Sequence, residues 1–189
     1  MSFNDYKTKP SVVLVYTGDG KGKTSAAVGL MARALGNGWR VAFIQFIKHW
    51  PVGEHDFIDQ VKPVFKRKLY FYKGGKGFYN AGALSAKNVT NLQHKKAARA
   101  TFEKAMQAAG SGRYDLVICD EINNAAYEGL LPKGFLKRLI KSRAASTSLC
   151  LTGRNFPREF LGQADIATNM TKLKHHFDDK YLANKGIDF

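Results

Sequence analysis

The stretch Thr17-Gly18-Asp19-Gly20-Lys21-Gly22-Lys23-Thr24 lies between an apolar run and a helical pattern, and this context decides the fold. The run before it, residues 12–16, has the β-branched composition of a buried parallel strand. Residues 25–35 after it carry apolar side chains at helical spacing. A strand, a glycine-rich turn ending in Gly-Lys-Thr and a helix together indicate a phosphate-binding P-loop.

The residue types in this loop suit a polyphosphate. Glycines let the backbone curl with its N–H groups pointing inward, and the helix N-terminus adds partial positive charge. Lys23 adds a full positive charge, and Thr24 is placed to put its hydroxyl on a magnesium ion. We therefore expect the phosphates to contact Thr17, Gly18, Asp19, Gly20, Lys21, Gly22, Lys23, Thr24 and Ser25.

The spacing of the loop departs from G-x-x-x-x-G-K-[ST], because only three residues separate Gly18 from Gly22. Either Thr17 takes the place of the first glycine, or the loop is one residue tighter. A tighter loop could hold the phosphates differently from that of an ordinary ATPase. The alternative is a glycine-rich turn that binds no ligand. A turn of that kind does not need three glycines, two lysines and a threonine so close together.

Length and composition indicate one globular domain. The chain has 189 residues, of which 44% are hydrophobic and 12% aromatic, enough for a full core. No run approaches the roughly 18 apolar residues of a membrane span, and the N-terminus has no secretory signal pattern. Cys119 and Cys150 lie in apolar runs, which favours buried reduced thiols and a cytoplasmic location. We expect residues 1–10 to form a flexible arm and residues 11–189 a single domain.

The formal net charge of +15 is large and spread along the chain. Such a field attracts polyanions and acidic partners. Nucleic acid is one candidate, but no recognised nucleic-acid motif accompanies the charge, and general solvation of the surface is an equally simple explanation.

A second buried strand over residues 40–47 completes a βαβ unit, which predicts a mostly parallel sheet with helices on both faces. The turn at residues 50–54 leaves this strand at the edge where ligands of α/β sheets gather. Residues 66–72 read as a third strand, followed by a loop, residues 73–82, whose four glycines predict mobility. Phe78 and Tyr79 in this loop suit a lid or a contact to a flat ligand; the alternative is that they fold back and pack.

The second half of a magnesium–nucleotide site follows a helix predicted over residues 86–109. Asp120 and Glu121 end an apolar strand downstream of the P-loop, where one of them would ligate magnesium directly or through water. The alternative is that the pair caps the next helix. The pattern next predicts a basic helix over residues 132–142 that begins with a proline. A strand predicted over residues 148–152 places Arg154 at the same edge of the sheet, and a last strand is predicted over residues 164–170.

These segments together resemble the ATP:corrinoid adenosyltransferases of cobalamin biosynthesis. The matching segments run from residue 12 to the C-terminus, and the short P-loop spacing is itself typical of that family. They are residues 16–24, 45–48, 50–54, 77–78, 120–123, 151–154, 164–165, 174–175 and 185–188.

The resemblance implies a P-loop, RecA-like domain that transfers the 5′-deoxyadenosyl group of ATP to the Co(I) of a corrinoid and releases triphosphate. It implies that ATP is held in the reverse sense from most P-loop enzymes, with the ribose 5′ carbon exposed. Co(I) is a strong nucleophile, so the protein has to position the reactants and neutralise the leaving triphosphate. The resemblance implies that Lys23, Thr24, Glu121 and Phe78 are catalytic and that Arg154 is a further ATP contact. It implies that Mg²⁺ is held by Thr24, Asp120 and Glu121. The implied corrinoid contacts are Phe78, Tyr79, Trp50 and Glu54.

In the family, aromatic side chains displace the lower axial ligand of cobalt and make it easier to reduce. Phe78 matches the first loop aromatic, but Asn80 stands where the second is expected, and Tyr79 is the candidate to compensate. The short N-terminal arm is a further departure. The resemblance also implies a homodimer and an electron donor that is a reduced flavin or a flavodoxin-like protein, whose acidity would suit the basic surface.

Two other functions use the same residues. The first is a basic P-loop ATPase acting on nucleic acid, which leaves the matching segments outside the P-loop unexplained. The second is a relative that binds nucleotide or corrinoid without turnover, suggested by Asn80.

Overall fold

The computed structural model describes residues 4–77, 79 and 88–189. Within these residues the core is a six-stranded sheet in the order β3-β2-β4-β5-β1-β6, with every neighbouring pair parallel. The strands are β1 (Val13–Thr17), β2 (Val41–Gln45), β3 (Leu69–Lys73), β4 (Leu116–Asp120), β5 (Ser148–Thr152) and β6 (Ile166–Asn169). The predicted α/β architecture with a mostly parallel sheet is confirmed.

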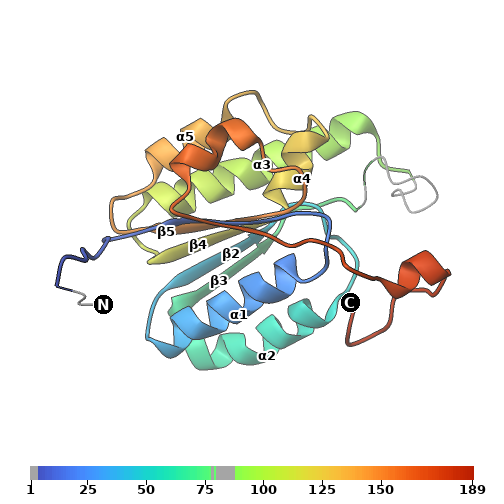
Figure 1. The fold of residues 1–189 in the computed structure, drawn as a ribbon, viewed down its shortest axis with the longest axis horizontal. Helices are drawn as coiled ribbons and strands as arrows, with labels where there is room; N and C mark the ends of the chain where they lie inside the picture. Colours follow the sequence, from blue (N-terminus) through green and yellow to red (C-terminus); the bar gives the residue numbers. More distant parts are fainter. Residues whose placement is uncertain (1–3, 78, 80–87) are drawn as a thin grey trace.

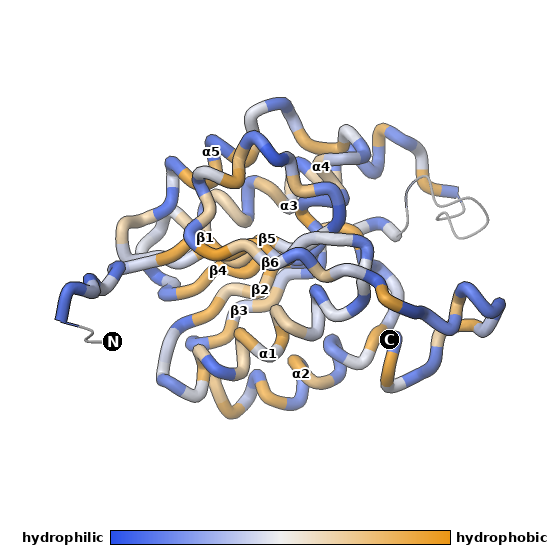
Figure 2. Tube along the Cα trace, in the orientation of Figure 1, coloured by the Kyte–Doolittle hydropathy of each residue, from blue (hydrophilic) through white to orange (hydrophobic). Residues whose placement is uncertain are grey.

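Helices cover both faces of the sheet, as the sequence predicts (Figure 1). One layer holds α1 (Lys23–Gly36) and α2 (Gly53–Phe65), and the other holds α3 (Asn91–Gly110), α4 (Ile122–Tyr127) and α5 (Phe135–Ser142). Short 3₁₀ segments are η1 (Lys66–Lys68), η3 (Arg158–Gln163) and η4 (His176–Asp179). Figure 2 shows the apolar strands enclosed between these two layers.

Alternate residues of each strand face opposite layers, so the central strands are buried on both sides. In β2, Ala42 and Ile44 face the cluster around α3 and α5, whereas Val41 and Phe43 face the cluster around α1 and α2. Burial on both faces explains why these strands read as continuous apolar runs. Cys119 and Cys150 lie inside this core as free thiols, as expected.

The main local differences from the sequence-based prediction lie between the second and third strands. Residues 53–65 form α2, where only a turn at 50–54 was predicted. Pro63 inside this helix argues against a helix by propensity, but packing of Ile58 and Val61 against the core outweighs it. Residues 66–68 form η1, so the strand begins at Leu69 and not at Lys66.

Two predicted helices begin later than expected. α5 starts at Phe135 with Gly134 in the left-handed region as its N-cap, so Pro132 is not its first residue. α3 starts at Asn91 behind a capping box in which the side chains of Thr90 and Gln93 accept each other's backbone N–H groups. The predicted start at residue 86 lies outside the described residues.

The glycines after β3 serve close packing. A Cβ at Gly75 would lie 2.1 Å from the carbonyl oxygen of Ile47, and one at Gly74 would lie 1.8 Å from Oγ1 of Thr101. The N–H of Gly77 donates to the same Ile47 carbonyl at 3.0 Å. Gly74, Gly75 and Gly77 therefore pack closely against the end of β2 and its neighbours, and the mobility of the rest of the loop stays a prediction.

Among the described residues, no helix has the length and apolar character needed to cross a bilayer.

We expect Gly75→Ala to destabilise the fold by about 1–3 kcal/mol, because the added methyl group overlaps the backbone of Ile47. Urea unfolding followed by circular dichroism measures the change. Gly29→Ala is the matched control: it lies in α1 with nothing within 4 Å of the added methyl, and should stabilise by up to about 1 kcal/mol. Equal stability of both variants would contradict the close packing of Gly75.

Candidate functional site

The residues that carry the predicted chemistry come together at the carboxyl ends of the central strands. β1 leads into the glycine-rich loop, β4 ends at Asp120, and β5 ends at Thr152. Gln45 at the end of β2 lies beside Asp120 in register. This is the edge at which open parallel sheets bind ligands.

The glycine-rich loop is the tighter of the two forms that the spacing allowed. Thr17 is the last residue of β1, so the loop begins at Gly18. Gly18 and Gly22 have φ angles of 101° and 107°, a left-handed backbone that favours glycine. Gly22 is also the N-cap of α1 and has no side chain to satisfy the first N–H groups of the helix, which suits them to an anion.

Lys23 folds back over this loop. Its ammonium donates to the carbonyl oxygens of Gly18 at 2.7 Å and Gly20 at 2.5 Å. Burial and the nearby Arg154 lower the pKa of Lys23. The lysine therefore lies at the mouth of the anion loop, and an arriving phosphate would replace weak carbonyl acceptors with a full negative charge.

Asp120 is the centre of a buried hydrogen-bond cluster. Its Oδ1 accepts from Oγ1 of Thr152 at 2.7 Å and from Oγ1 of Thr24 at 3.1 Å. Its Oδ2 accepts from Nε2 of Gln45 at 2.9 Å and is 3.3 Å from Thr24 Oγ1. The predicted meeting of Thr24 and Asp120 is thus present, with Asp120 fully buried.

Glu121 lies one residue further, in a left-handed conformation with φ of 61°. It occupies the N-cap position of α4, but its side chain makes no capping hydrogen bond. Within the described residues its buried Oε2 has no hydrogen-bond partner. Burial and the adjacent Asp120 raise the pKa of Glu121 to about 7. Helix capping therefore does not explain its carboxylate, which would gain from a cation.

Lys48 is a site residue that sequence reasoning missed. Its ammonium is 2.6 Å from Oε1 of Glu54 and 3.4 Å from Oγ1 of Thr24, with 15% of the side chain exposed. Burial alone would lower the pKa of Lys48, but Asp120, Glu121 and Glu54 outweigh it and raise that pKa. The sequence feature that could have identified Lys48 is its position directly after the second apolar run, at the edge of the sheet where ligands bind.

The residues here suit a magnesium ion that arrives with a nucleotide. Thr24 donates its hydroxyl hydrogen toward Asp120, which leaves oxygen lone pairs for a cation. Among the described residues, no three His, Cys, Asp or Glu side chains cluster as a ready-made metal site. Magnesium commonly takes few protein ligands and fills its shell with phosphate oxygens and water.

The remaining predicted phosphate contacts surround the loop. Arg154 is exposed and lies close enough to Asp19 to lower the pKa of that carboxyl, after the stronger effect of the Lys172 backbone N–H. Its own N–H donates to Oδ1 of Asn124 at 2.6 Å. Ser25 is exposed in the first turn of α1.

The C-terminal segment closes over the loop, which the sequence pattern did not reveal. The carbonyl of Met170 accepts from the N–H of Gly20 at 2.7 Å. The ammonium of Lys21 pairs with Asp188 at 2.5 Å, and 7% of the Asp188 side chain is exposed. Figure 1 shows this segment, in red, on the same side as the turn between β1 and α1.

The predicted corrinoid contacts are only partly described. Phe78 and Asn80 lie outside the described residues. Tyr79 is half-buried, with its ring centroid 5.1 Å from that of His94 in α3, which matches the alternative of packing against the domain. Trp50 is half-buried, and Glu54 is the partner of Lys48.

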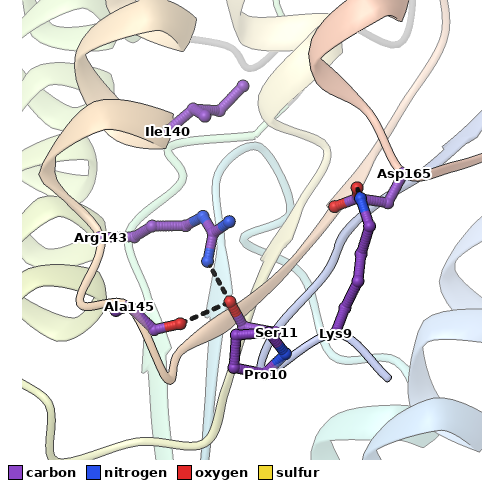
Figure 3. A pocket seen from close by; sticks show the side chains of 7 residues that line it. All are labelled: Lys9, Pro10, Ser11, Ile140, Arg143, Ala145 and Asp165. Atoms are coloured by element: carbon purple, nitrogen blue, oxygen red, sulfur yellow. Dashed lines mark hydrogen bonds and ion pairs between the residues drawn. The ribbon is translucent and has the colours of Figure 1, made fainter. Parts of the chain in front are cut away.

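A cavity of about 450 Å³ lies at the opposite edge of the sheet (Figure 3). There Ser11 donates to the carbonyl of Ala145 at 2.7 Å and accepts from Arg143, while Lys9 pairs with Asp165. These residues precede β1, β5 and β6, so the cavity is separate from the predicted site, which follows the strands.

The chain is similar to one family over nearly its whole length. Residues 9–189 match the family described as ATP:corrinoid adenosyltransferase BtuR/CobO/CobP. The corrinoid adenosyltransferase of Pseudomonas aeruginosa is 32% identical over 179 residues, which cover 94% of this chain and 83% of the relative. That of Escherichia coli K12 is 30% identical, and CobA of Salmonella typhimurium 31%, each aligned over 94% of this chain and 85% of the relative.

Among solved structures, the flagellar accessory protein FlaH of Methanocaldococcus jannaschii is similar with a TM-score of 0.54 and 14% identity. The match covers 85% of this chain and 71% of FlaH, and it concerns the fold alone. The family match covers far more than half of the residues and agrees with curated relatives over most of their length. The chain therefore belongs to the ATP:corrinoid adenosyltransferase family.

Proposed function

We propose that this protein transfers the 5′-deoxyadenosyl group of ATP to the Co(I) of a corrinoid, forming a cobalt–carbon bond and releasing triphosphate in cobalamin biosynthesis or salvage. The observation that carries the proposal is the meeting of Lys23, Thr24 and Asp120 at one sheet edge, in a chain of this family. Its curated relatives bear the name corrinoid adenosyltransferase.

In this proposal the loop binds the leaving group of the reaction. The N–H groups at the start of α1 and the ammonium groups of Lys21 and Lys23 neutralise charge on the triphosphate as the C5′–O bond breaks. Arg154, beside Asp19 and Lys23, adds a further positive charge near the loop. By resemblance to the family, ATP would be held with its ribose end toward the cobalt, and the short loop, with Gly18 directly after β1, is typical of that family.

Thr24 and Asp120 would hold Mg²⁺, with Glu121 beside them. When bound, the ion supplies charge neutralisation for the triphosphate. Thr24 would offer an oxygen lone pair to the ion while its hydroxyl group continues to donate a hydrogen bond to Asp120. A cation near Glu121 would favour the ionised form of that carboxylate. No general base is required because Co(I) is already nucleophilic, so Glu121 acts through its charge.

Phe78, Tyr79, Trp50 and Glu54 remain the proposed corrinoid contacts, by resemblance to the family. Glu54 is supported by position, since it lies 3.5 Å from Gln45 and pairs with Lys48 at the same edge as the loop. The contact between Tyr79 and His94 favours Phe78 as the residue that meets the corrinoid face.

The proposal extends to partners and location. A reduced flavin or a flavodoxin-like protein would deliver the electron, attracted by the net charge of +15. A homodimer is supported by exposed apolar side chains in the C-terminal segment, where Leu173 is 96% and Leu182 82% exposed. Two free buried cysteines agree with a cytoplasmic location.

Product analysis tests the reaction. Purified protein with MgATP, a corrinoid and a strong chemical reductant should give inorganic triphosphate and an adenosylcorrinoid, read from its visible spectrum. ADP and phosphate, stimulated by DNA or RNA, would favour the ATPase alternative. Binding of ATP or corrinoid without product would identify a non-catalytic relative.

We expect Lys23→Ala to reduce adenosylation at least about 100-fold, because it removes the ammonium that the leaving triphosphate needs. Steady-state kinetics with chemically supplied Co(I) measures the loss. Lys137→Ala, in α5 on the other layer, is the control and should leave the rate unchanged. Full activity of Lys23→Ala would remove the loop from the reaction.

We expect Phe78→Ala to reduce turnover far more when the cobalt is reduced on the enzyme than when Co(I) is supplied. The physical reason is that Phe78 would displace the lower axial ligand of cobalt. Loss of that donor destabilises the oxidised ion and so makes the cobalt easier to reduce. Parallel assays with a flavin-based reductant and with a strong chemical reductant measure the difference. The same fractional loss in both assays would limit Phe78 to packing.

A further inference from the structure

A buried hydrogen-bonded chain links α2 to the carboxylate of Asp120 through the side chain of Gln45. Nε2 of Gln45 donates to Oδ2 of Asp120 at 2.9 Å, and Oε1 of Gln45 is 2.6 Å from Nε2 of His55. Gln45 and Asp120 are fully buried, and His55 is 6% exposed. The proposed phosphate and corrinoid contacts leave His55 and Gln45 without a role.

The hydrogen bonds that link His55, Gln45 and Asp120 can run in only one direction. A carboxylate accepts hydrogen bonds, so the amide nitrogen of Gln45 must face Asp120. The amide oxygen then faces His55, and the ring must donate through Nε2–H. A longer contact of 3.5 Å joins the same amide nitrogen to Oε1 of Glu54.

His55 is held so that it can make this donation. It lies in the first turn of α2, and its ring centroid is 5.6 Å from that of Phe71 in β3. Its buried Nδ1 has no hydrogen-bond partner among the described residues, which suits a bare acceptor nitrogen. Burial, with Lys73 nearby, also lowers the pKa of His55 and favours the neutral ring.

We propose that Gln45 and His55 are positioning residues for Asp120: the ring of His55 orients the Gln45 amide, and the amide orients the carboxylate toward Thr24. The proposal rests on the magnesium site proposed above. Asp120 ends its strand, and Gln45 holds Oδ2 while Thr152 holds Oδ1. Both oxygens thereby stay within 3.3 Å of the Thr24 hydroxyl. Partners of this kind typically change metal affinity or activity about 10–100-fold.

The test measures nucleotide binding, so it does not depend on turnover. Fluorescence anisotropy of an N-methylanthraniloyl derivative of ATP gives its Kd with saturating Mg²⁺ and with EDTA, and the ratio of the two reports magnesium coupling. Gln45→Met and His55→Phe each remove a link in the series of hydrogen bonds from His55 to Asp120, and each replacement side chain is of similar size. His55→Gln retains an N–H donor for Gln45.

We expect Gln45→Met and His55→Phe to lower the coupling ratio about 10-fold, with the Kd in EDTA unchanged. His55→Gln should stay within about twofold of the unaltered protein. Thr147→Val is the matched control, because it removes a buried 2.8 Å hydrogen bond to Tyr114 at the other end of the sheet and should leave the ratio unchanged. Asp120→Asn marks the full loss of coupling.

Unaltered coupling in Gln45→Met and His55→Phe beside a loss in Asp120→Asn would overturn the positioning role and leave the proposed function intact. Unaltered coupling in Asp120→Asn would refute both the magnesium site and the positioning role. Nitrogen-15 NMR of the unmutated protein adds a readout that needs no variant to fold. A His55 ring protonated on Nε2 supports the chain, and one protonated only on Nδ1 would overturn it.

Discussion

The buried carboxylate of Asp120 is the interaction on which the candidate site depends. A carboxylate inside a parallel sheet is costly unless hydrogen bonds replace its water. Those bonds come from Gln45 in β2, Thr152 in β5 and Thr24 in α1. The need to satisfy one charged group therefore draws two neighbouring strands and the helix after the glycine-rich loop to a common point.

The second constraint is the approach of the C-terminal segment to the loop. A Cβ at Gly18 or Gly20 would lie 2.4 or 2.6 Å from the carbonyl oxygen of Met170. Gly20 also donates to that carbonyl, and Lys21 reaches Asp188. Two of the loop glycines are thus required by a segment about 150 residues away in sequence, in addition to any phosphate.

Features set by local chemistry were predictable from the sequence. The strand–loop–helix around Lys23, the buried strands and the position of Asp120 at a strand end all follow from patterns within a few residues. The hydrogen bond between Thr24 and Asp120 followed from the parallel topology, which brings strand ends to one edge.

Features set by packing between distant segments were not predictable in the same way. The ion pair of Lys48 and Glu54 depends on α2, whose Pro63 obscured the helical pattern. His55 meets Gln45 only because α2 packs beside β3. The pairing of Lys21 with Asp188 joins the loop to a tail without periodicity. In each case both residues can be read in the sequence, but the sequence does not show that they lie next to each other in space.

The place of β1 in the sheet has a consequence for synthesis of the chain. β1 is made before the other five strands of the described sheet, yet its neighbours are β5 and β6, which are made after the rest. While β2, β3 and β4 are being made, β1 has no native partner on either side, and the phosphate loop that it carries lacks the Met170 contact. A nascent chain can therefore form the β2–β4 region early, but it completes its nucleotide site only after β5, β6 and the segment around Met170 have been made.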